Sequence, residues 1–310
     1  MADLNGLLAA LTATSCLSLS VLSSQTGATE SPAQNRHSSS AEAAEEAVRY
    51  EVEQQRQSLE QEAKKTLDQD AVLIVEETRN TIRAIESNNN AYAAEAIRQA
   101  MERVQALLTR NPATAQIAVD VNVEICDRAP TDSASIIEIA QDASRSFDDK
   151  DFPTARVLLH SLMSEIRLRK YSLPLATFPE ALRRAARLID ESKYQSARAV
   201  LLTALKTFVI SDRIIPIPLL TARYAINVAE AERQENDAAA HKFLEIARNE
   251  LDRARNLGYA GNNPEYMSLR DQISELEKQL TDKKDVSAAF GKLAKKIAEF
   301  LHRQSENQHG

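Results

Sequence analysis

Five histidines are the residues of this 310-residue chain best suited to acid–base chemistry or metal binding. They stand far apart in the sequence, and none has a partner at the helical spacing of metal ligands. His160 follows Leu159 on a predicted helix, which favours a surface or partly buried histidine over a ligand. A pH-sensing role stays open, because imidazole titrates near physiological pH. The histidines are His37, His160, His241, His302 and His309.

Carboxylates and cysteine offer little more chemistry. Glu76-Glu77 and Asp148-Asp149 are adjacent acidic pairs, but acid–base catalysis would need a pocket that raises one pKa, and such pairs on helices and turns are usually solvated. Cys126 ends a predicted strand, and Asp127 beside it opposes a thiolate. We therefore interpret Cys126 as a small buried hydrophobic residue rather than a reactive thiol.

Glycine-rich nucleotide loops, nucleophile elbows, zincin helices and calcium loops are missing from the sequence. Only six glycines occur in the chain, and four of them lie in the terminal regions. The sequence therefore predicts a protein that is not an enzyme, with no catalytic residue, no cofactor and no metal site.

The composition predicts a mainly helical chain, so helices must position the residues that bind its partners. Hydrophobic residues make up 43% and charged residues 27% of the chain, there is no Trp, and Ala, Leu, Glu, Arg and Gln dominate long stretches. The net charge of -7 argues against nucleic acid as a partner, because binding to its backbone needs clustered Lys and Arg.

Apolar spacing divides the chain into segments. Residues 41–87 form a polar helical arm whose later part carries one apolar stripe, and Asn88-Asn89-Asn90 ends that helix before a second one that stops at Asn111-Pro112. Between Ile117 and Ile125 apolar residues alternate with polar ones, which predicts a strand.

From residue 149 onward a helical unit repeats. Phe152-x-x-Ala155-x-x-x-Leu159 and Tyr194-x-x-Ala197-x-x-x-Leu201 share one spacing, and a weaker third copy follows near Ala240. Extended segments with prolines, 171–175 and 214–218, join the units and could cover the strand as a small sheet. The predicted fold is mainly α: antiparallel helical hairpins or a bundle, with a small β element near 117–125.

The two ends of the chain leave alternatives open. Residues 7–22 are apolar enough for an export signal, but no Lys or Arg precedes them, so the predicted location is the periplasm, or the cytoplasm if 7–22 is not a signal. Residues 25–40 resemble a linker. Residues 286–301 form an amphipathic, locally basic helix that docks on the body or on a second subunit, or else lies on a membrane surface. The predicted segments are thus 1–40, 41–87, 88–282 and 283–310.

Three motifs give residues 149–280 a resemblance to the YfdX family of bacterial stress-associated proteins. They are Lys193-Tyr-x-x-Ala197, Ile215-Pro216-Ile217-Pro218-Leu219 and the close at Ala254 to Tyr259. The resemblance implies an exported, mostly helical, often oligomeric protein linked to acid or drug stress with chaperone-like behaviour. It supplies no catalytic residue.

We therefore expect a stress-associated protein that binds unfolded clients or small apolar molecules between Ala-lined helices, as a homo-oligomer. The alternative is a helical-repeat scaffold that recruits specific protein partners. The repeat is longer than a tetratricopeptide unit and lacks its Trp-Leu-Gly signature.

Overall fold

The computed structural model describes residues 34–261, 263–282 and 285–306. It separates into two compact units, Met1–Arg49 and Tyr50–Gly310, and the contacts below lie within the second. The predicted export signal at 7–22, Cys16 and His309 lie outside the described residues. Among the described residues, no helix is long and apolar enough to cross a membrane.

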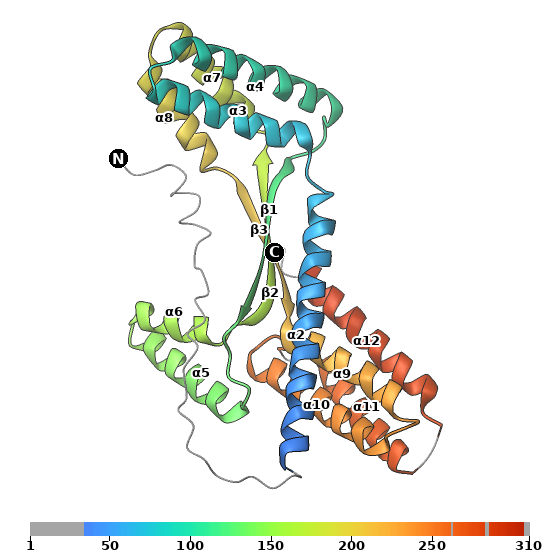
Figure 1. Ribbon diagram of the computed structural model, residues 1–310. Helices are drawn as coiled ribbons and strands as arrows, with labels where there is room; N and C mark the ends of the chain where they lie inside the picture. Colours follow the sequence, from blue (N-terminus) through green and yellow to red (C-terminus); the bar gives the residue numbers. More distant parts are fainter. Residues whose placement is uncertain (1–33, 262, 283–284, 307–310) are drawn as a thin grey trace. The chain divides into compact units, whose positions relative to one another are not determined.

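The chain is mainly α-helical with one small sheet, as the sequence predicts (Figure 1). The helices are α2 (Gln34–Lys64), α3 (Gln69–Glu86), α4 (Asn90–Arg110), α5 (Ser133–Asp148), α6 (Phe152–Ser161), α7 (Phe178–Asp190), α8 (Tyr194–Leu205), α9 (Ile217–Glu232), α10 (Asp237–Asn256), α11 (Pro264–Thr281) and α12 (Ser287–Glu306). The strands are β1 (Gln116–Asp127), β2 (Ser164–Pro174) and β3 (Val209–Pro216).

The sheet is antiparallel with the order β1-β2-β3. The predicted strand near 117–125 is β1, and the predicted small sheet is confirmed. Residues 171–174 of the first proline-containing joint belong to β2, which pairs with β1. Residues 214–216 of the second belong to β3, which pairs with β2, while residues 217–218 begin α9. Pro174 and Pro216 are the last residues of β2 and β3, where a missing N–H costs no ladder bond.

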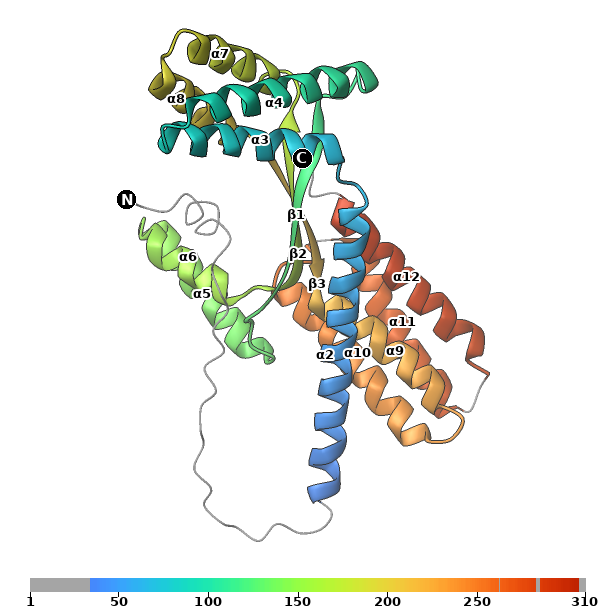
Figure 2. The same cartoon turned by 45° about the horizontal axis from the view of Figure 1, so that its top comes forward.

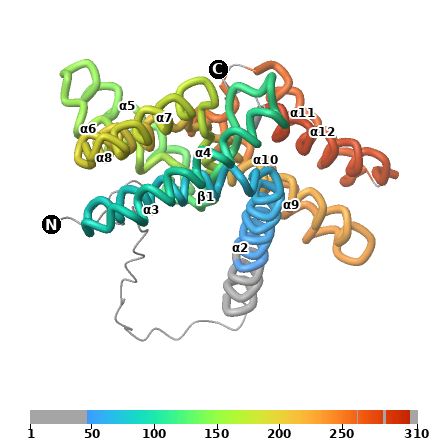
Figure 3. The backbone as a smooth tube through the Cα atoms, turned by 90° about the horizontal axis from the view of Figure 1, so that it is seen from above, coloured from blue at the N-terminus to red at the C-terminus, as the bar shows by residue number. Residues whose placement is uncertain are grey.

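Helical hairpins lie at alternating ends of the sheet. The hairpin α3–α4 precedes β1, α5–α6 connects β1 to β2, and α7–α8 connects β2 to β3. Because the strands are antiparallel, α3–α4 and α7–α8 meet at one end of the sheet, where α4 contacts α7 and α3 contacts α8 (Figures 1 and 3). The hairpin α5–α6 leaves from the opposite end, where α5 contacts α10.

The last four helices form a bundle in which α9 contacts α10, α10 contacts α11, α11 contacts α12 and α12 contacts α9 (Figure 2). Gly258 ends α10 with a φ of 87°, the left-handed cap that the sequence indicates. The apolar stripe within 286–301 is buried, so α12 docks on the body of its own chain: Val286, Phe290, Leu293, Ile297, Phe300 and Leu301. Membrane contact by this segment stays a prediction, and it would require α12 to leave this bundle.

Two local predictions are wrong. Residues 41–87 are not one helix, because α2 ends at Lys64 and α3 begins at Gln69. Asp68 caps α3 by accepting a hydrogen bond from Ala71 N at 3.1 Å, while its own N–H donates to Ala118 O of β1 at 3.3 Å. Residues 34–40, expected to be linker, are the first turns of α2. The predicted limits of the segments 1–40, 41–87, 88–282 and 283–310 stay predictions.

Candidate functional site

The hairpin α5–α6 is well formed by local sequence. Asp132 caps α5 by accepting from Ser135 N at 2.8 Å, and Asp151 caps α6 by accepting from Thr154 N at 3.2 Å. These bonds to backbone and side-chain donors lower the pKa of both carboxyls. Lys150 takes a φ of 62° in the turn between the helices. The hairpin is therefore a defined element and not a loose loop.

The surface of this hairpin is unusually apolar for an exposed element. Only Ile136, Ala143 and Ala155 are buried in its two helices. The rings of Phe147 and Phe152 meet edge to face at the turn, with centroids 5.5 Å apart. Large hydrophobic side chains more than two fifths exposed lie along both helices: Ile137, Phe147, Phe152, Val157 and Leu159. Exposed apolar side chains gathered on one element mark it as a candidate interaction site.

The repeated spacing shows that α6 lacks a covering element that α8 has. Ala155 and Ala197 are both buried, so each helix turns its small residue inward. Leu201 of α8 is 0% exposed, whereas Leu159, at the same position of the spacing in α6, is 58% exposed. The hairpin α3–α4 packs on α7–α8, and α5–α6 contacts the rest of the chain chiefly through α5 and α10.

A buried polar cluster fastens the base of α5–α6 to the bundle. Ser164 Oγ donates to Asp127 Oδ1 at 2.7 Å, which joins the end of β1 to the start of β2. Tyr259 Oη accepts from Ser164 N at 3.0 Å and donates to Glu165 Oε2 at 2.9 Å. Burial raises the pKa of Tyr259, and the charge of Glu165 raises it further. Tyr259 therefore stays neutral and acts as a hydrogen-bond bridge.

Arg253 extends this cluster to the chain that leads into α5. It is 6% exposed, and it donates to the carbonyl oxygens of Ala129 and Pro130 at 3.0 Å each. Asp127 and Glu250 lie 3.4 Å from its guanidinium nitrogens. Burial raises the pKa of Glu250, Arg253 opposes that rise, and Asp127 adds to it. Arg253 bonds two backbone carbonyls of the segment between β1 and α5, so the cluster fixes the position of this segment at the base of the hairpin.

A groove lies between α7 and α8. It has a volume of about 550 Å³ and is lined mainly by small and apolar side chains. Ala181, Ala199 and Ala204 line it together with Phe178, and Glu180 and Arg184 are its charged lining residues. The groove could accept a small apolar molecule.

The residues singled out for chemistry do not converge. His160 is exposed on α6, His241 is half-buried on α10 and His302 is exposed on α12, while His37 belongs to α2. Within the described ranges, His, Cys, Asp and Glu form no group of three that could hold a metal ion. Glu76 and the pair Asp148-Asp149 are exposed.

Cys126 is half-buried in β1 opposite Glu165, rather than fully buried as expected. The polar cluster beside it was missed by sequence reasoning. Its only signal was the presence of Asp127 and Glu165 at the ends of apolar strands.

Comparison with known proteins gives one family. The family described as YfdX protein matches residues 74–213. Of the motifs that carry the resemblance, Lys193 to Ala197 lies within this range, whereas Ile215 to Leu219 and Ala254 to Tyr259 lie beyond it. A solved structure of YfdX from Salmonella Typhi is similar at 13% identity and a TM-score of 0.34, covering 49% of this chain and 93% of that one. No curated protein matches the sequence significantly.

Proposed function

We propose that this chain, whose residues 74–213 match the YfdX family, is a non-enzymatic, stress-associated protein that holds unfolded clients. The observation that carries the proposal is the exposed apolar face of α5–α6, in particular Leu159 at 58% exposure where its counterpart Leu201 is fully buried. Unfolded chains expose apolar side chains, and contact with this face would remove both surfaces from water.

The character of the hairpin suits transient binding of many sequences. Its apolar side chains are mixed in shape and include two phenylalanines, so they can contact different clients without a fixed pattern of hydrogen bonds. The Arg253 cluster keeps the hairpin's base in place while its outer face is occupied. Small apolar molecules are the second class of ligand in this proposal, and the groove between α7 and α8 is their site.

Self-association is part of the same proposal. An apolar hairpin that is uncovered in one chain can be covered by a second copy. We therefore propose a homo-oligomer in which contacts with clients replace contacts between subunits. The proposed location is the periplasm, which rests on residues 7–22 and is tested by mass spectrometry of the mature amino terminus.

The decisive experiment compares aggregation of a denatured client with the parent protein and with the double variant V157Q/L159Q. Both side chains are exposed, so the variant should fold normally and lose most of the suppression. The matched control is V209T/I210T, which removes apolar surface of similar exposure from strand β3. Equal activity of V157Q/L159Q and the parent would contradict the assignment to α5–α6, and so would equal loss in both variants.

A scaffold for specific partners stays the alternative. It predicts that pull-downs return one defined complex at fixed stoichiometry, and that V157Q/L159Q abolishes this complex without changing client aggregation. Client binding predicts a broad mixture of captured proteins instead.

A further inference from the structure

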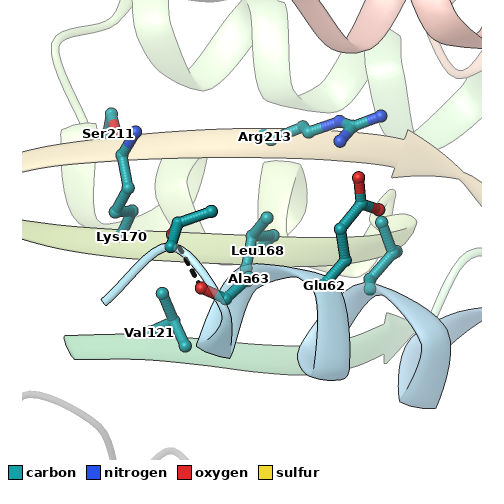
Figure 4. Close-up of a pocket in the computed structure, with 9 residues that line it drawn as sticks. Glu62, Ala63, Val121, Leu168, Lys170, Ser211 and Arg213 are labelled. Atoms are coloured by element: carbon teal, nitrogen blue, oxygen red, sulfur yellow. Dashed lines mark hydrogen bonds between the residues drawn. The ribbon is translucent and has the colours of Figure 1, made fainter. Parts of the chain in front are cut away.

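A pocket lies between the carboxyl-terminal half of α2 and one face of the sheet, separate from the surfaces described above (Figure 4). Its volume is about 190 Å³. Apolar side chains from α2 and the sheet are among its lining residues: Leu59, Ala63, Val121 and Leu168. Leu59 and Ala63 are buried, so α2 packs closely on the sheet at this point.

The face of the sheet that lines the pocket also carries two cations and a hydroxyl. Lys170 pairs with Ser211 across β2 and β3, and Leu168 pairs with Arg213, so these four side chains share one face of the sheet. Lys170, Ser211 and Arg213 all line the pocket (Figure 4). Three hydrogen-bond donors from neighbouring strands thus line one small pocket.

Neither cation has a partner among the described residues. The arginines of the opposite face of β2 are paired, Arg167 with Glu165 at 2.5 Å and Arg169 with Asp212 at 2.8 Å. Lys170 and Arg213 make no such ion pair or side-chain hydrogen bond in the described ranges, and Nε of Arg213 is buried without an acceptor. A buried donor without an acceptor is unfavourable, which an anionic ligand would relieve.

The charge around the pocket fits a single acid group. Lys170 and Arg213 carry two positive charges, and the exposed carboxylate of Glu62 is the one negative charge among the lining residues. Glu62 makes no ion pair with either cation in the described part of the chain. It would repel a ligand of high negative charge, while a monoanion would still meet net positive charge.

We propose that this pocket binds a small organic carboxylate. Its acid group accepts hydrogen bonds from Lys170, Ser211 and Arg213, and its carbon part lies against Leu59, Ala63, Val121 and Leu168. The partly apolar lining distinguishes this ligand from inorganic phosphate, which would leave the apolar side chains without a contact. The proposal does not depend on client binding by α5–α6.

Calorimetric titration of the full chain tests the proposal with three probes. Benzoate combines a carboxylate with an apolar ring and should bind saturably. Benzyl alcohol keeps the ring without the charge, and inorganic phosphate keeps charge without the ring, so each should bind at least about tenfold more weakly, as expected for the loss of charge-assisted bonds or of apolar contact. Phosphate binding as tight as benzoate binding would overturn the assigned ligand class.

Variants of the lining residues locate the site. K170Q and R213Q should each weaken benzoate binding by about tenfold or more, because each removes a charged donor. E62Q should tighten it severalfold by removing the repelling carboxylate. The control K206Q removes an exposed lysine outside the pocket and should change nothing. Circular dichroism confirms that each variant is folded. Absence of saturable benzoate binding by the parent, or binding unchanged in both K170Q and R213Q, would refute the site.

Discussion

Tyr259 Oη lies 2.9 Å from Glu165 Oε2, and the two residues are 94 positions apart in the sequence. The same hydroxyl accepts from Ser164 N at 3.0 Å. One phenol therefore joins the end of the α10 helix to the first residues of β2, where the hairpin α5–α6 returns to the sheet. Glu165 is 3% exposed, so the bond replaces water that this carboxylate has lost.

The first prediction concerns this bridge. Y259F should lower the free energy of unfolding by about 1–3 kcal/mol, because it leaves a buried carboxylate oxygen and a backbone N–H without this partner. Urea unfolding followed by circular dichroism measures the change. Y92F is the matched control, since Tyr92 is 48% exposed and makes no such bond among the described residues. An equal effect of Y259F and Y92F would show that the bridge contributes nothing.

Glu250 gives a prediction about pH. Burial raises its pKa in the folded chain above the ordinary value of 4.5. A carboxyl with a raised folded pKa favours the folded state fully below its unfolded pKa, and this contribution is lost as the pH rises through the folded pKa. E250Q should therefore unfold less readily than the parent at neutral pH, and the difference should vanish below about pH 4. Chemical unfolding at a series of pH values checks this. Lower stability of E250Q at pH 7 would mean that the ion pair with Arg253 outweighs the cost of burial.

The repeated spacing in α6 and α8 allows a direct comparison of burial. L201A should cost about 2–5 kcal/mol, because it opens a cavity in a fully covered site. L159A should change the free energy of unfolding by less than about 0.5 kcal/mol, as substitutions at exposed positions usually do. Denaturant unfolding of both variants measures the difference. If L159A proved as costly as L201A, and this cost fell on dilution, a second copy would cover Leu159 in solution.

Asp68 provides a test of the break between α2 and α3. D68A removes the side-chain acceptor for Ala71 N and should cost about 1 kcal/mol. D68N keeps a capping oxygen but removes the charge that lies 3.6 Å from Arg110, so it should stay near the parent value. Thermal unfolding compares the three proteins. A loss in D68N equal to that in D68A would assign the effect to the ion pair rather than to the cap.

Much of the architecture could be predicted from local sequence. Alternation over Ile117 to Ile125, the triple asparagine at 88–90 and Gly258 each dictate a backbone state through near neighbours alone, and the structure confirms them. The break at 65–68 was not visible, because no glycine or proline marks it. It is set by a side-chain cap at Asp68 and a hydrogen bond to Ala118, which is distant in the chain.

Sequence alone determined which helices are amphipathic, where β1 lies and that the recognised catalytic motifs are missing, because these depend on residue type and short-range spacing. Tertiary structure alone decided which apolar faces are covered. Leu159 and Leu201 have the same local pattern, and only the packing of α3–α4 on α7–α8 buries one and leaves the other exposed. It also decided that Lys170 and Arg213 share a pocket, because strand pairing and the path of α2 bring together residues that no sequence spacing relates.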